Sequence, residues 1–74
     1  MSDISNKVIA VSKPYLGPAT EAFLGRHCKL FLKIDIAALT SANLKDLAGC
    51  CEVGGRAIME PAKATELAKK IAAL

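Results

Sequence analysis

Pro14-Tyr15-Leu16-Gly17-Pro18 separates two segments of helical pattern, and it decides how the chain must turn. A proline has no backbone N–H and a fixed φ, so Pro14 is expected to end or kink the helix before it. Gly17 can adopt the backbone angles of a tight reversal, and Pro18 suits the first position of a new helix. Tyr15 and Leu16 would then be held at a fixed, apolar corner.

The segments on either side of this corner have helical periodicity. Before it, apolar side chains recur on one face up to Pro14. These are Ile4, Val8, Val11 and Tyr15. After it, a helix that opens at Pro18 carries an apolar stripe flanked by Leu24 and Cys28. The residues of that stripe are Ala19, Ala22, Phe23, Leu30 and Phe31. The pattern predicts a helical hairpin.

The second half of the chain predicts two more helices. Residues 32–38 alternate like a strand, but they have no convincing partner strand, so we interpret them as a connection with a short extended or helical piece. Thr40 is a natural N-cap for a helix that Gly54-Gly55 should break. After a turn at residues 56–59, a last helix is expected over about residues 61–74.

Together these elements predict a single all-α domain over residues 1–74, a compact bundle of four short helices with the proline-flanked corner between the first two. Its expected core consists of Val8, Val11, Tyr15, Phe23, Phe31, Leu44, Leu47, Ile58, Leu67 and Ile71.

Composition narrows the class of protein. The chain has 74 residues and a net charge of +3, which is far from the dense basic stripe of a dedicated nucleic-acid binder. No apolar run approaches the ~20 residues of a membrane span. Three cysteines, two of them adjacent, do not suggest a secreted disulfide framework. We therefore expect a reduced, cytoplasmic protein that makes no membrane contact.

The spacing of the histidine and cysteine residues argues against metal binding and against catalysis. His27, Cys28, Cys50 and Cys51 could supply four zinc ligands, but neighbours on a helix diverge by about 100°, whereas zinc ligands are usually spaced to converge. The same divergence argues against a His27–Cys28 catalytic pair. We interpret Cys28 and Cys51 as small core residues and Cys50 as a boundary residue. The sequence predicts no catalytic residue, no metal site and no cofactor.

Residues 44–60 have the apolar spacing of a degenerate helix-turn-helix, which leaves DNA binding as an alternative function. Glu52 stands at a turn position that usually favours glycine, and Pro61 cuts the second helix short. Arg56 is the one candidate DNA contact in that helix, where several are normally needed.

The corner and the helix after it resemble a small helical module with the pattern Y-I/L-G-P. That module occurs in bacterial signalling proteins, including the C-terminal ends of some Ser/Thr kinases. Residues 15–19 carry the specific part of the likeness, and Leu44, Leu47 and Ala48 match a later L-x-x-L-A element. The Gly54-Gly55 break and the cysteine pair depart from the pattern. The resemblance implies a helical accessory domain for protein–protein contact, without catalytic residues.

The leading expectation is therefore a non-enzymatic protein-interaction or regulatory module. Its expected partner is a protein, either a different one or a second copy of this chain. Tyr15, Leu16 and Ile58 are the expected contact residues, because they place apolar groups at the corner and at the 56–59 turn.

Overall fold

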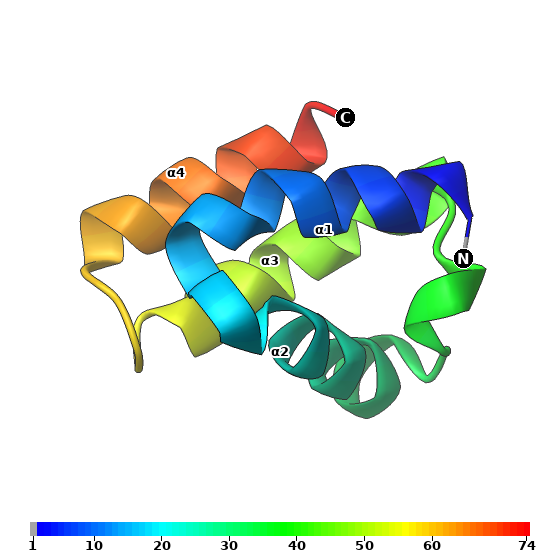
Figure 1. Ribbon diagram of the computed structural model, residues 1–74, viewed down its shortest axis with the longest axis horizontal. Helices are drawn as coiled ribbons and strands as arrows, with labels where there is room; N and C mark the ends of the chain where they lie inside the picture. The colour runs from blue at the N-terminus through cyan, green and yellow to red at the C-terminus, as the bar shows by residue number, and fades with distance from the viewer. Residues whose placement is uncertain (1) are drawn as a thin grey trace.

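A computed structural model describes residues 2–74, and all regular structure in this part of the chain is helical (Figure 1). The α-helices are α1 (Asp3–Leu16), α2 (Thr20–His27), α3 (Leu44–Gly55) and α4 (Pro61–Ala72). A 3-10 turn (Gly17–Ala19) precedes α2 and a π-helical turn (Cys28–Leu32) follows it, and two more 3-10 turns (Ile36–Ala38 and Ser41–Asn43) lead into α3. The predicted all-α class is confirmed.

The predicted bundle of four helices is not confirmed. Three helices of 12 to 14 residues, α1, α3 and α4, form the body of the molecule. The second helical segment is a composite in which only eight residues, Thr20–His27, are α-helical. It changes from 3-10 to α to π geometry along its length, and Lys33 ends it in the left-handed conformation, with φ 61° and ψ 31°.

The corner differs from expectation at Pro14. Helix α1 passes through Pro14 and ends two residues later at Leu16, so the expected end at Pro14 is wrong. A proline in the last helical turn deprives only the Ala10 carbonyl of its donor, and Ala10 is exposed, so water can serve instead. Gly17 makes the reversal with φ 60°, a value that favours glycine, and its N–H donates to the Lys13 carbonyl. Pro18 lies in the 3-10 turn, and α2 begins at Thr20.

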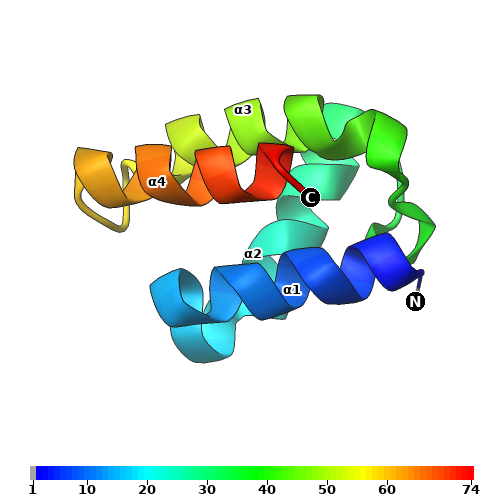
Figure 2. The same cartoon turned by 90° about the horizontal axis from the view of Figure 1, so that it is seen from above.

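The helices form two layers joined by α2 (Figure 2). Helices α3 and α4 lie side by side in one layer, and α1 lies in the other. The chain passes from α1 through the corner into α2, which reaches across to contact α3. The Thr65 hydroxyl donates to Glu52 at 2.8 Å and thereby links α4 to α3.

The predicted core is right for half of its members. Val8, Leu44, Leu47, Leu67 and Ile71 are buried, while Val11, Tyr15 and Phe23 are partly buried against the core. Phe31 and Ile58 are exposed and do not belong to it. Core residues absent from that list are Ile9, Leu16, Leu24, Leu39, Ala48, Ala64 and Ala68, while Cys28 and Cys51 are buried, as the interpretation of the cysteines predicted.

The error at Phe31 has a geometric cause. Helix α2 and the π-helical turn after it bury the face that carries Thr20, Leu24 and Cys28, at spacing i, i+4, i+8. The expected stripe is rotated away from the core, and the wider π-helical turn leaves Leu30 and Phe31 outside. Two apolar stripes compete on this segment, and the core accepts only one of them.

The connection between the layers is helical rather than extended. The Asp35 carboxylate accepts from the Ala37 N–H at 2.9 Å and starts a 3-10 turn, and the Ser5 hydroxyl of α1 donates to the Ile36 carbonyl. Leu39 then enters the core. Thr40 is the N-cap of the 3-10 turn Ser41–Asn43 that leads into α3, and its backbone N–H donates to the Asn43 side chain at 3.0 Å in a capping box. The N-cap of α3 itself is Asn43. Helix α3 ends at Gly55, close to the predicted break.

The core contains Leu24 and not Phe31, and this difference can be tested by substitution. Leu24→Ala should lower the free energy of unfolding by about 3 kcal/mol, because it truncates a fully buried side chain. Phe31→Ala should change it by less than about 1 kcal/mol, because that ring is largely exposed. Urea unfolding followed by circular dichroism measures both, and a larger loss for Phe31→Ala than for Leu24→Ala would contradict the core described above.

Candidate protein-interaction surface

Four large apolar side chains lie exposed on the π-helical turn, on α3 and on the turn that follows α3. Leu30 is 53 % exposed, Phe31 59 %, Val53 69 % and Ile58 61 %. We call these four residues the apolar face. Single exposed apolar residues are ordinary, but several together in a chain of this size are the usual mark of a contact surface.

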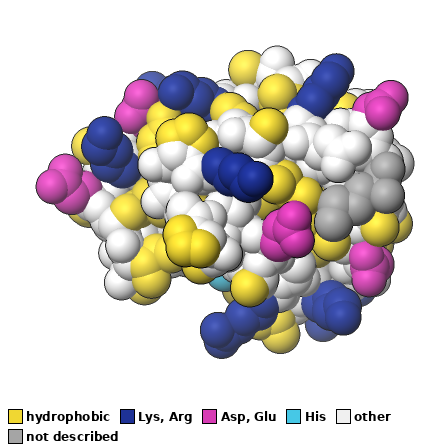
Figure 3. Space-filling view, viewed as in Figure 1, with side chains coloured by type: hydrophobic (Ala, Val, Ile, Leu, Met, Phe, Trp, Pro, Cys, Tyr) yellow, Lys and Arg dark blue, Asp and Glu magenta, His cyan; other side chains and the backbone are white. Residues whose placement is uncertain are grey.

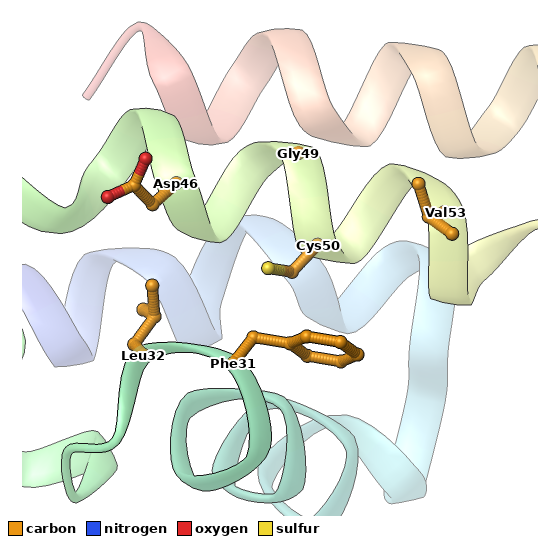
Figure 4. Close-up of a pocket in the computed structure, with 6 residues that line it drawn as sticks. All are labelled: Phe31, Leu32, Asp46, Gly49, Cys50 and Val53. Carbon is orange, nitrogen blue, oxygen red and sulfur yellow. The ribbon is translucent and has the colours of Figure 1, made fainter.

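The apolar face is hollowed on both sides of Phe31. The first hollow has a volume of about 510 Å³ and lies between the π-helical turn and α3 (Figure 4). It is lined by Phe31, Leu32, Asp46, Gly49, Cys50 and Val53. The second, of about 520 Å³, lies between α2 and the end of α3. Its lining includes Arg26, His27, Leu30, Phe31, Gly54 and Ile58. Phe31 lines both hollows and therefore stands between them.

An aromatic ladder supports the second hollow. Phe23, His27 and Phe31 follow at i, i+4, i+8, and the rings of Phe23 and His27 stack with centroids 4.1 Å apart. The His27 and Phe31 centroids are 5.6 Å apart. His27 Nδ1 lies 2.9 Å from the Phe23 carbonyl, which can only accept, so Nδ1 carries a proton. This bond fixes the orientation of the imidazole ring.

Gly54 lets α3 approach this ladder. A Cβ atom at position 54 would lie only 2.2 Å from His27 Nε2. At the next residue, a Cβ on Gly55 would meet the Ala64 Cβ at 3.2 Å, so the glycine pair faces α2 on one side and α4 on the other. We predicted these glycines only as a helix break. Their second role, close packing on two neighbours, depends on contacts distant in sequence.

Charges of opposite sign lie on the two sides of the apolar face. Asp46 lines the first hollow and Arg26 the second, and both are exposed. On the side of the molecule drawn in Figure 3, basic and acidic side chains are interspersed with hydrophobic ones, without a broad field of one sign. That side therefore lacks the dense basic patch of a phosphate-binding surface.

The three expected contact residues are not brought together. Ile58 belongs to the apolar face, Leu16 is buried in the core, and Tyr15 is half-buried in a separate hollow beside Met59 and Lys63. Lys70 Nζ lies 5.2 Å from the centroid of the Tyr15 ring, in cation–π range. Hydrogen bonding to the Tyr15 side chain, aided by Glu66, raises the pKa of Lys70.

The sequence prediction missed Leu30, Phe31 and Val53 as contact residues. Leu30 and Phe31 fit a helical stripe as well as core residues do, so periodicity could not separate them from the core. Val53 offered a usable signal, because it falls outside the Leu44, Leu47 and Cys51 stripe of its own helix.

The helix-turn-helix on which the alternative of DNA binding depended does not form in residues 44–60. Helix α3 runs without interruption from Leu44 to Gly55, through the place where the turn should lie, and the next helix begins only at Pro61. The apolar spacing that suggested two helices belongs to one helix and a turn. Arg56 lies 3.8 Å from Glu52 in an ion pair within one helical turn. The structure therefore offers no recognition helix to carry Arg56 as a DNA contact.

The cysteines occupy the predicted positions, with Cys28 and Cys51 buried and Cys50 half-buried on the edge of the first hollow. Burial raises the pKa of Cys51 to about 12, with smaller contributions from Cys28 and Cys50. Burial also raises the pKa values of Cys28 and Cys50, which disfavours their nucleophilic thiolate forms. Within residues 2–74, no three His, Cys, Asp or Glu side chains are grouped closely enough to hold a metal ion.

Comparison with known proteins gives no further identification: no family model matches the chain, and no curated protein or solved structure shows significant similarity to it. The likeness of residues 15–19 to the bacterial signalling module stays a prediction. None of the helices in the described part of the chain has the length and apolar character needed to cross a bilayer.

Two glycines of α3 test the packing of the ladder. Gly54→Ala should lower the free energy of unfolding by about 1–2 kcal/mol, because the new methyl group displaces His27 from its stack and hydrogen bond. Gly49→Ala is the matched control, since a Cβ there meets nothing within 4 Å, and it should stabilise the helix by about 0.5–1 kcal/mol. Chemical denaturation measures both. Equal effects of the two substitutions would contradict the close approach of Gly54 to His27.

The burial of Cys51 predicts a loss of stability at high pH. The folded protein holds the Cys51 proton up to about pH 12, whereas the unfolded chain releases it near the ordinary value of 9.0. The contribution is therefore complete below pH 9 and is lost as pH rises toward 12, at about 1 kcal/mol per pH unit. Urea unfolding at pH 8, 9 and 10 should show a shallower decline for Cys51→Ala. Parallel declines for the two proteins would refute this assignment.

Proposed function

We propose that this protein is a non-enzymatic interaction module of the cytoplasm that binds a protein partner through the apolar face of Leu30, Phe31, Val53 and Ile58. The observation that carries the proposal is the exposure of these four side chains in a chain whose other large apolar residues are mostly buried or half-buried. Covering such groups on binding supplies the main favourable term in protein association.

The segments that carry the apolar face are anchored by buried residues, and this rigidity supports a role in binding. Behind Phe31, the π-helical turn is anchored by buried Cys28, and behind Val53, α3 is anchored by buried Leu47 and Cys51. The ladder and the Gly54 contact fix α2 against α3. A surface held in place before binding loses less conformational entropy when a partner covers it.

A regulatory role in bacterial signalling is the more specific part of the proposal. It rests on the resemblance of Tyr15-Leu16-Gly17-Pro18-Ala19 to the helical accessory module and on the absence of any predicted catalytic residue. In this proposal Tyr15 and Leu16 act as structural residues of the corner, and Ile58 is the one of the three expected contact residues that touches the partner.

A site-specific crosslink tests the proposal in the native cell. A photoreactive amino acid at position 58 should form a discrete adduct with a partner, identified by mass spectrometry and rebuilt from purified components. Phe31→Ser should reduce the adduct by about tenfold, because it removes the ring between the two hollows.

Leu74→Ser is the matched control, because Leu74 is also an exposed apolar residue, 42 % accessible, but lies outside both hollows. It should leave the adduct unchanged. Circular dichroism of each variant checks that the fold is kept. The absence of a discrete adduct, or an adduct of equal yield in Phe31→Ser, would refute the proposal.

A further inference from the structure

The arrangement of charge around Phe31 has a self-complementary form. Phe31 lines both hollows, Asp46 lines only the first, and Arg26 lines only the second. Among the described residues, Asp46 is the only charged side chain that lines the first hollow, and Arg26 is the only Lys, Arg, Asp or Glu that lines the second. The face therefore carries a negative group on one side of a central aromatic ring and a positive group on the other.

From this arrangement we propose that the occupant of the apolar face is a second copy of this chain, related by a two-fold axis that passes beside Phe31. The inference rests on the proposed function, since it uses the same face. A two-fold axis through the middle of a face exchanges its two sides. Arg26 of each copy then lies opposite Asp46 of the other, and the two Phe31 rings meet near the axis.

Other occupants fit the charges less well. An acidic amphipathic helix would be attracted by Arg26 and repelled by Asp46. A basic helix would be attracted by Asp46 and repelled by Arg26. A second copy satisfies both charges at once. Exposed charge pairs of this kind fix the register of the partners and exclude wrong ones more than they add affinity.

The size of the molecule sets the strength expected of this dimer. The backbone extends 28 × 22 × 21 Å, so its broadest side covers about 600 Å². An interface that used a whole side of each copy would bury at most about 1,200 Å² in total, which is the lower limit of specific interfaces. The structure therefore predicts a reversible dimer whose population depends on concentration, rather than an obligate one.

Charge reversal tests the symmetry directly, by sedimentation equilibrium at about 0.05 M salt. The wild-type protein should dimerise. Arg26→Glu places Glu against Asp46 twice in a homodimer, and Asp46→Arg places Arg against Arg26 twice, so each variant alone should dimerise about tenfold more weakly. An equimolar mixture should recover the association, because in a heterodimer both contacts again join opposite charges.

Lys7→Glu and Asp3→Arg are the matched controls, because they make the same charge changes at exposed positions of α1 outside both hollows. Neither should weaken the dimer by as much, and circular dichroism confirms that every variant is folded. A wild-type protein that stays monomeric at millimolar concentration overturns the inference. Single variants that associate as tightly as the wild type, or a mixture without recovery, also overturn it.

The position-58 crosslink tests the proposed function separately from the dimer. A monomeric protein whose position-58 crosslink captures a different protein, and loses it in Phe31→Ser, keeps the proposed function and refutes the second copy as occupant. A monomeric protein without any Phe31-dependent adduct refutes both.

Discussion

The left-handed backbone angle at Gly17 is the constraint on which the arrangement of the helices depends. With φ 60° at this residue, the chain leaves the axis of α1 and returns as α2 within a few residues. A residue with a Cβ resists this angle, so the direction of α2 is set by one glycine. Thr20 holds the turn closed, because its hydroxyl donates to the Gly17 carbonyl at 2.6 Å. Where α2 then meets α3 decides which of its faces is buried.

The surplus of apolar side chains on α2 and the π-helical turn connects the fold with the proposed function. This segment carries two apolar stripes, and the core has room for the one through Leu24 and Cys28. The other stripe is left to the solvent at Leu30 and Phe31, beside Val53 and Ile58 from α3 and the turn after it. A small domain has a high ratio of surface to volume and cannot bury every apolar group it carries. In the proposed function, a protein partner covers this second stripe.

Much of the backbone was predictable because its signals are local. The Thr40 N-cap, the end of α3 at Gly55 and the start of α4 at Pro61 each depend on residues within one helical turn. The candidate surface was far less predictable. Ile58 was expected to serve both as a core residue and as a contact residue, and only the second assignment agrees with its exposure. Leu16, expected at the contact surface, is in the core.

Local sequence signals are enough to predict the helical class, the reversal at the proline corner and the burial of the α4 stripe through Leu67 and Ile71. These features follow from periodicity, capping and backbone geometry, which act over a few residues. Three features could be learned only from the packed fold: α1 continues through Pro14, Leu24 rather than Phe31 enters the core, and Gly54 leaves room for the His27 ring. Each of these depends on how a helix is rotated and on what lies beside it, and that rotation is fixed by contacts between segments far apart in the chain.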